Sequence, residues 1–158
     1  MFTVNRKVLW AAAAACVACL AIAMYLQLVK QMYPCPLCII ARYVFIGVAS
    51  LAILAALAPR ACQHWGALLA GLTALGGVGL GLYHQWVLAH PLDSCGIDPT
   101  KTMLNKLFTA EWFPNVFYAS GMCSDLYPSF FGLQIPMWSL LSFIALSLVL
   151  LRVAARRG

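Results

Sequence analysis

Long stretches without charged side chains dominate this chain and most constrain what it can fold into. Residues 8–29 contain no charge, and residues 37–58 contain only Arg42. About 20 apolar residues in a helix cross the hydrocarbon core of a bilayer. Two further apolar stretches cover residues 65–89 and 136–151. The sequence therefore predicts an all-α membrane protein, a four-transmembrane-helix bundle that forms one domain over residues 1–158.

The composition supports this class. Hydrophobic residues make up 64% of the chain and charged residues only 9%, whereas about a quarter of the residues in a soluble domain are charged. The net charge is +6, but the basic residues are scattered beside the apolar stretches, so no nucleic-acid partner is expected. The first stretch resembles a signal peptide, but it is longer than a usual h-region and no small-x-small cleavage site ends it.

The distribution of basic residues predicts the topology, because cytoplasmic loops of membrane proteins are enriched in lysine and arginine. Loops 30–36 and 90–135 hold three lysines together with the four acidic residues, Asp93, Asp98, Glu111 and Asp125. The opposite side holds only basic charges: Arg6, Lys7, Arg60, Arg152, Arg156 and Arg157. We expect both termini to be cytoplasmic and both of these loops to face outward.

A C-x-x-C motif, Cys35 and Cys38, lies between prolines where a short polar loop meets the second apolar stretch. This spacing serves reversible disulfide exchange or metal binding. Arg42 follows Cys38 by four residues and shares its helix face, where its positive charge would favour a thiolate. A charge inside a membrane span suggests function, although the alternative is that Arg42 extends to the lipid headgroups.

The second outward loop also carries two cysteines, Cys95 and Cys123. Four cysteines in an oxidising compartment indicate a disulfide relay, although the sequence leaves three possible pairings open. No haem, dinucleotide or flavin motif is present, so a membrane quinone is the expected electron acceptor. Cys38 would attack or stack against the quinone ring, and Arg42 would stabilise negative charge on a ring oxygen.

Other patterns have more ordinary interpretations. Cys16 and Cys19 form a second C-x-x-C within the first apolar stretch and are expected to help helices pack. The glycines at positions 71, 76, 77, 79 and 81 also predict close helix packing, and Gly77 and Gly81 have small-xxx-small spacing. Apolar residues at roughly helical spacing between 103 and 113 predict a short amphipathic helix in the membrane interface, or a loop segment packed on the bundle.

Three segments, in order, resemble the DsbB family of bacterial disulfide-bond formation proteins. Residues 35–42, CPLCIIAR, resemble the family's C-x-x-C-x-x-x-R. Residues 111–123, EWFPNVFYASGMC, resemble its W-x-P-x-V-F-x-A-S-G-x-C segment, and residues 132–138 are similar to the start of its last helix. Two departures are visible: Ala41 replaces an acidic residue often found there, and the stretch from Pro91 to Cys95 is short.

The resemblance implies a function and a location in the bacterial inner membrane, with the cysteine loops periplasmic. Such proteins reoxidise a periplasmic thioredoxin-fold partner, DsbA, and pass the electrons to ubiquinone or menaquinone. By position, Cys95 would form the mixed disulfide with the partner, and Cys123 would exchange with Cys35. Cys38 would lie next to the quinone beside Arg42. His84, which could otherwise be an interfacial hydrogen-bonding residue, matches a quinone-associated histidine.

Three alternatives compete with this interpretation. The C-x-x-C, the methionines and the extra cysteines could serve a soft metal such as copper, but the methionines are scattered. A relative of the vitamin K epoxide reductases would place its C-x-x-C late in the chain rather than early. A purely structural bundle would leave Arg42 and the two cysteine pairs without a role.

Overall fold

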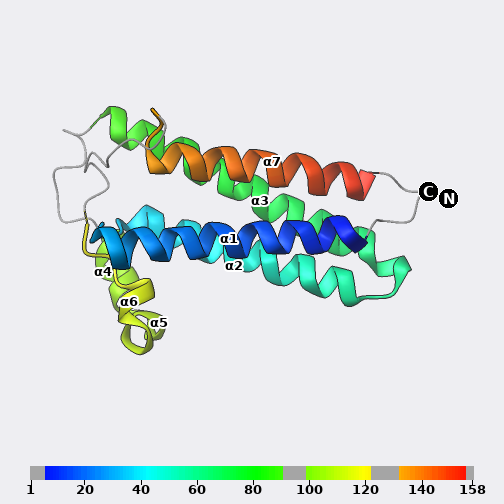
Figure 1. The fold of residues 1–158 in the computed structure, drawn as a ribbon, viewed down its shortest axis with the longest axis horizontal. Helices are drawn as coiled ribbons and strands as arrows, with labels where there is room; N and C mark the ends of the chain where they lie inside the picture. The colour runs from blue at the N-terminus through cyan, green and yellow to red at the C-terminus, as the bar shows by residue number, and fades with distance from the viewer. Residues whose placement is uncertain (1–5, 91–98, 122–131, 156–158) are drawn as a thin grey trace.

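The computed structural model describes residues 6–90, 99–121 and 132–155, and four long helices account for most of them (Figure 1). Each is long and apolar enough to cross a membrane. The predicted all-α bundle of four such helices is therefore confirmed, and the chain is a multi-pass membrane protein. The helices are α1 (Arg6–Lys30), α2 (Pro36–Leu57), α3 (Arg60–Ala89) and α7 (Ile135–Ala155).

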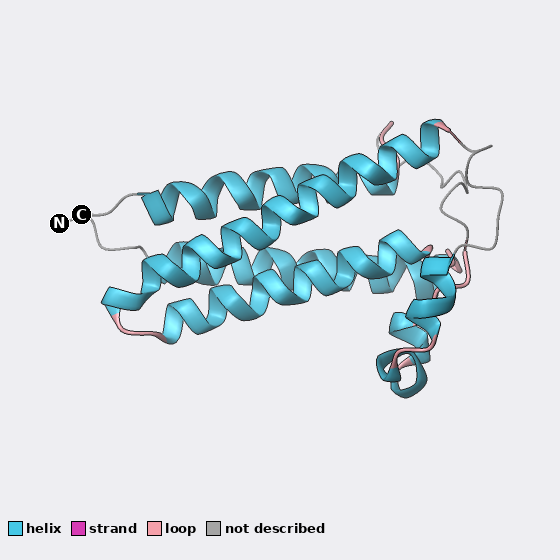
Figure 2. Ribbon diagram, turned by 180° about the vertical axis from the view of Figure 1, so that it is seen from behind, coloured by secondary structure: helices cyan, strands magenta, loops and turns pink. Residues whose placement is uncertain are grey.

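Helix α3 is the central member of the bundle, since it packs along both α2 and α7, while α1 packs mainly along α2 (Figure 2). The core between them consists of small and aromatic side chains. Phe45 of α2 and Phe143 of α7 stack with ring centroids 4.1 Å apart. Cys16 of α1 is fully buried in the same core, as expected for a cysteine that packs between helices.

The glycines of α3 allow α7 to approach closely. A Cβ atom on Gly77 would lie 2.6 Å from the Phe143 ring, and one on Gly81 would lie 2.9 Å from Leu140. The space next to Phe143 and Leu140 is therefore too small for a methyl group on either glycine. The packing role predicted for these two glycines is therefore confirmed.

The structure corrects the predicted start of the third helix. The sequence placed the apolar stretch of this helix at residues 65–89, but α3 begins at Arg60, directly after Pro59. The Cys62 backbone N–H donates to the Pro59 carbonyl at 2.9 Å, and the buried Gln63 side chain donates to the Ala58 carbonyl at 3.2 Å. Proline is compatible with a helix start because its missing N–H is not needed there. The membrane boundaries 8–29, 37–58, 65–89 and 136–151 stay predictions.

The loop before α7 contains three short helices, α4 (Pro99–Asn105), α5 (Phe108–Trp112) and α6 (Pro114–Phe117). A single amphipathic helix was expected over part of this segment. A turn at residues 106 and 107 divides it instead. The next short helix starts at Pro114, because proline cannot continue a preceding helix. Met103, Phe108 and Trp112 are largely exposed. That these short helices lie in the membrane interface stays a prediction.

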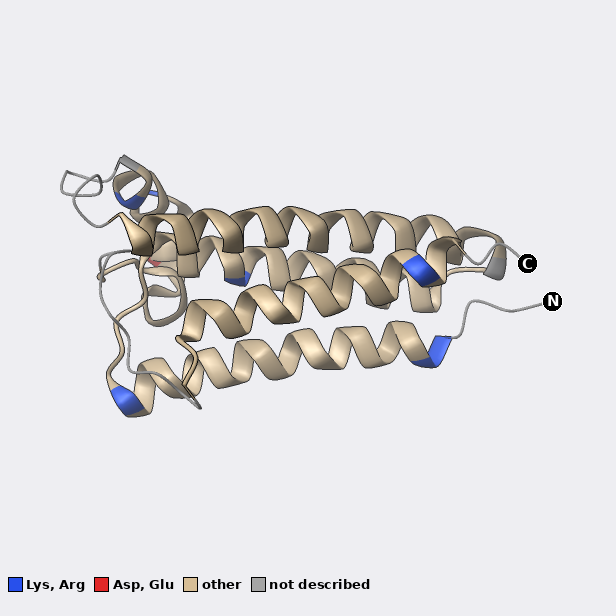
Figure 3. Cartoon of the chain, turned by 90° about the horizontal axis from the view of Figure 1, so that it is seen from above, with Lys and Arg blue, Asp and Glu red and all other residues tan. Residues whose placement is uncertain are grey.

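The two ends of the bundle differ. The start of α1 and the end of α7 lie at one end together with the α2–α3 turn, while α4, α5 and α6 lie at the other end, near the start of α2 (Figure 1). On α1, α2 and α7, the charged residues are close to helix ends, apart from Arg42 within α2 (Figure 3). This arrangement is compatible with the predicted topology, in which both termini share one side of the membrane.

Candidate redox site

The C-x-x-C motif forms the first turn of α2. Cys35 is the N-cap residue, and its Sγ accepts a hydrogen bond from the Cys38 backbone N–H at 3.3 Å. Pro36 occupies the first helical position, where its fixed φ suits the helix. The Sγ atoms of Cys35 and Cys38 are 3.0 Å apart. Because a helix N-terminus carries partial positive charge, this position stabilises a negatively charged sulfur.

His84 of α3 lies against this pair. Its Nε2 atom is 3.7 Å from the Cys35 Sγ, and its side chain is only 4% exposed. The ligand atoms of Cys35, Cys38 and His84 all lie within 4.8 Å of one another. The structure thus brings His84 next to the two predicted site cysteines, although it lies 49 residues after Cys35 in the sequence.

Arg42 lies one turn after Cys38 and is 6% exposed. Its Nη1 donates to the Val116 carbonyl of α6 at 2.5 Å and to the Met24 Sδ at 3.7 Å. The side chain is therefore held inside the protein, which disfavours the alternative in which it extends to lipid headgroups. Ala41, one residue earlier, also faces the cavity beside this site.

The loop segment that contains the second family-like motif, residues 111–123, is bound to the start of α2. The backbone N–H groups of Ser120 and Gly121 donate to the Pro34 carbonyl at 3.2 and 3.1 Å. A Cβ atom on Gly121 would lie 2.6 Å from the Tyr33 oxygen, so only glycine fits this approach without a shift. The Asn105 side chain exchanges two hydrogen bonds with the Ala119 backbone. Cys95 and Cys123 themselves lie outside the described residues.

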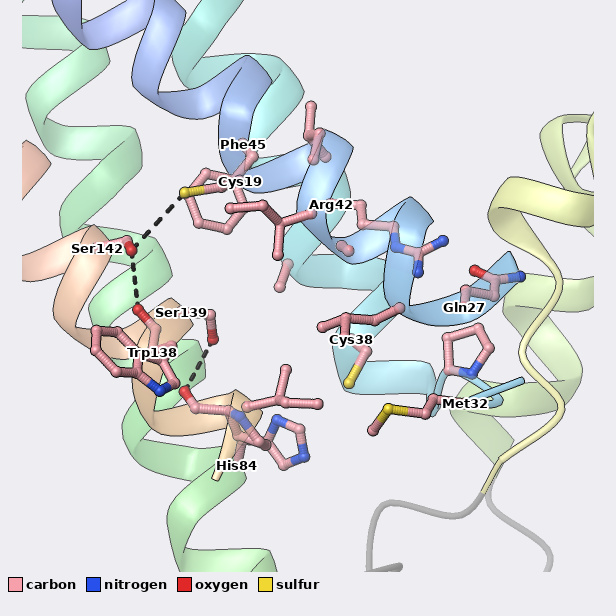
Figure 4. Close-up of a pocket in the computed structure, with 18 of the residues that line it drawn as sticks. Cys19, Gln27, Met32, Cys38, Arg42, Phe45, His84, Trp138, Ser139 and Ser142 are labelled. Atoms are coloured by element: carbon pink, nitrogen blue, oxygen red, sulfur yellow. Dashed lines mark hydrogen bonds between the residues drawn. The ribbon is translucent and has the colours of Figure 1, made fainter. Parts of the chain in front are cut away.

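A cavity of about 410 Å³ opens beside the C-x-x-C, between α1, α2, α3 and the start of α7 (Figure 4). Its volume is within the range of small-molecule sites. Most of the lining is apolar. In Figure 4 the Cys38 sulfur points into the cavity. The lining also includes one more cysteine, Cys19, and five polar side chains: Gln27, Arg42, His84, Ser139 and Ser142.

Four of these lining residues, Cys19, Gln27, Ser139 and Ser142, were not predicted from the sequence. Cys19 was expected to serve helix packing only, yet it lines the cavity, and its Sγ lies 3.8 Å from the Ser142 Oγ. Gln27 had a signal that could have been used, because it is the only side-chain amide in the uncharged stretch 8–29. A polar side chain within a membrane span is often functional.

These features define a class of protein: a multi-pass membrane protein with a buried dithiol centre beside a ligand-sized cavity. The family model described as "Disulfide bond formation protein DsbB" matches residues 5–153. The chain belongs to this family, as the resemblance of its motifs predicted.

Curated relatives agree with this assignment. A protein named Disulfide bond formation protein B from Herminiimonas arsenicoxydans is 43% identical over 153 residues, which is 97% of each chain. One of the same name from Ralstonia nicotianae is 41% identical over 135 residues, 85% of this chain and 84% of the relative. Disulfide bond formation protein B 1 from Burkholderia lata is 39% identical over 156 residues, 96% and 88% of the two chains. This protein is therefore a membrane oxidoreductase of disulfide bond formation.

Proposed function

We propose that this protein reoxidises a periplasmic thioredoxin-fold dithiol protein of the DsbA kind and passes the electrons to a membrane quinone. Membership of the DsbB family supports the disulfide-forming half of the reaction. One observation carries the quinone half: Cys38 and Arg42 line the same largely apolar cavity of about 410 Å³. The quinone would be ubiquinone or menaquinone, since both offer a flat apolar ring with carbonyl oxygens.

The overall reaction balances. Two thiols of the partner lose two electrons and two protons and become a disulfide. When bound, the quinone accepts these two electrons and two protons and becomes a hydroquinone. Within the chain, disulfides pass from one cysteine pair to the next by thiolate attack through mixed disulfides, so each exchange conserves electrons.

The order of exchange is the one that the family resemblance implies. By family resemblance, Cys95 forms the mixed disulfide with the partner and Cys123 is its loop mate. Cys123 then exchanges with Cys35. The hydrogen bond from Gly121 to Pro34 supports this step, because it joins the residue two positions before Cys123 to the residue directly before Cys35.

The residues around the cavity fit a quinone ring. Arg42 presents hydrogen-bond donors and a positive charge, both suited to a ring oxygen that gains electron density. His84 and Arg42 would hold the ring, and the Cys38 sulfur already points into the cavity (Figure 4). The apolar remainder of the lining excludes water and suits a lipid-soluble ligand.

The proposed location is the bacterial inner membrane, with both termini cytoplasmic and the cysteine loops periplasmic. The excess of basic residues near the termini supports this orientation. It would expose the relay cysteines to the compartment in which disulfides persist.

A second candidate function is binding of a soft metal ion such as Cu(I), because Cys35, Cys38 and His84 offer three ligand atoms within 4.8 Å of one another. The two functions predict different behaviour. Stoichiometric metal retention by the fully reduced protein, without quinone reduction, would favour the metal function.

Quinone absorbance followed over time tests the proposed oxidase function. Purified protein in detergent receives ubiquinone or menaquinone and a reduced thioredoxin-fold dithiol partner. We expect catalytic loss of quinone that Cys38→Ser and Cys95→Ser each abolish. Folded protein that consumes neither quinone with a competent partner would contradict the proposal.

A further inference from the structure

We propose that Gln27 determines the preference of the cavity for the reduced ring, because its side-chain oxygen accepts a hydrogen bond from a hydroxyl group of the hydroquinone. This inference rests on the proposed function, in which the hydroquinone is the product. It adds a residue of α1 to the proposed quinone-binding residues Cys38, Arg42 and His84, which come from α2 and α3.

The Gln27 amide is an unusual feature of the cavity wall. Its Oε1 atom is buried and has no hydrogen-bond partner among the described residues. Gln27 also lines the cavity. A buried polar atom without a partner costs free energy, so native proteins satisfy nearly all of them. A ligand in the cavity that donates a hydrogen bond would satisfy this oxygen.

The orientation of the amide is set by its other end. The Gln27 Nε2 donates to the Asn115 carbonyl of α6 at 2.8 Å. A flipped amide would place an oxygen against that carbonyl oxygen, which is unfavourable because both are acceptors. The unpartnered atom is therefore the oxygen, an acceptor.

The two redox states of the ligand differ in the hydrogen bonds that they can make. A quinone has carbonyl oxygens, which only accept, whereas a hydroquinone has hydroxyl groups, which also donate. The Arg42 guanidinium only donates, so it can bond an oxygen of either state. The Gln27 oxygen only accepts, so it can bond the hydroquinone alone.

Gln27 and Arg42 are close enough to address the same part of a ring. They donate to the carbonyls of two successive residues of α6, Asn115 and Val116. Figure 4 shows both side chains at the same end of the cavity. A ring oxygen that bonds Arg42 therefore lies near Gln27 as well.

Equilibrium binding tests this role without turnover. The dissociation constants of short-chain ubiquinone and ubiquinol are measured separately and without oxygen, for the wild type and for Gln27→Leu. A neutral hydrogen bond contributes on the order of 1 kcal/mol, so we expect ubiquinol to bind about fivefold more weakly to the variant, with ubiquinone changed less than about twofold. Gln27→Met, which also lacks the amide oxygen but keeps a long unbranched side chain, should behave in the same way.

Gln85→Leu is the matched control. The Gln85 Nε2 atom is also buried and has no partner in the part of the chain that the structure describes, but Gln85 is not among the residues that line the cavity. This control should change neither constant. Equal weakening of both ligands by the Gln27 variants, or unchanged ubiquinol binding, would overturn the inference alone. A wild type that binds neither ligand would overturn the proposed function with it.

Discussion

The Arg42 guanidinium of α2 donates to the Val116 carbonyl of α6 at 2.5 Å, and this bond joins the cavity wall to the second loop. Arg42 also lines the cavity. A single side chain thus contacts both the proposed quinone site and the segment that leads to Cys123. We infer that removal of this side chain affects both parts of the relay.

Arg42→Met should weaken quinone binding strongly. The substitution keeps an apolar side chain in the cavity but removes the charge and every donor. Hydrogen bonds to charged groups contribute about 1.5–3 kcal/mol, so we expect the apparent quinone affinity to fall about 10- to 100-fold. The dependence of quinone consumption on quinone concentration measures this change. An unchanged apparent affinity would remove Arg42 from the site.

Gly121→Ala should impair the docking of the second loop. An added Cβ would lie 2.6 Å from the Tyr33 backbone oxygen, so the hydrogen bonds of Ser120 and Gly121 to Pro34 must lengthen or break. Transfer of the disulfide between the loop and the C-x-x-C should slow about tenfold, the effect of about 1.4 kcal/mol. Rapid quenching followed by thiol alkylation and mass measurement would follow this transfer. Wild-type transfer in the variant would show that docking through Pro34 is not needed.

Gly77→Ala should destabilise the bundle, whereas Gly76→Ala should not. A methyl group on Gly77 overlaps the Phe143 ring, while the space around Gly76 is open within 4 Å. Overpacking of a close contact costs about 1–3 kcal/mol. Thermal unfolding in detergent compares the two variants directly. Similar midpoints for both would contradict the close α3–α7 packing.

Three cysteines outside the proposed relay should be dispensable for turnover. The triple variant Cys16→Ser, Cys19→Ser and Cys62→Ser should keep at least half of the wild-type activity, a loss of under about 0.4 kcal/mol in transition-state stabilisation. Some loss of stability is expected, because Cys16 is fully buried in the apolar core and serine adds a polar group there. A large activity loss in folded protein would instead indicate a role for Cys19 at the cavity.

The helical class and the dithiol site could be read from the sequence because both depend on local patterns. An apolar stretch of bilayer length indicates a helix whatever it packs against. Cys35, Cys38 and Arg42 all lie at the start of the same helix, α2. His84 was proposed from resemblance alone, and the structure brings it within 3.7 Å of the Cys35 sulfur.

Other parts of the site depend on contacts between distant segments, which no local pattern records. The hydrogen bonds from Arg42 and Gln27 to α6 span 74 and 88 residues of sequence. The division of residues 99–117 into three short helices also was not predicted. Apolar spacing suggested one short helix between residues 103 and 113, but a turn at residues 106 and 107 interrupts it, and a further helix starts at Pro114.

The stoichiometry of the reaction tests the central claim most directly. Without oxygen, reduced thioredoxin-fold partner, quinone and purified protein are mixed, and both the partner disulfide and the hydroquinone are quantified. The proposed function predicts one disulfide formed for each hydroquinone, with neither product in the Cys38→Ser variant. Partner disulfide that forms without an equal amount of hydroquinone would contradict electron transfer to the quinone.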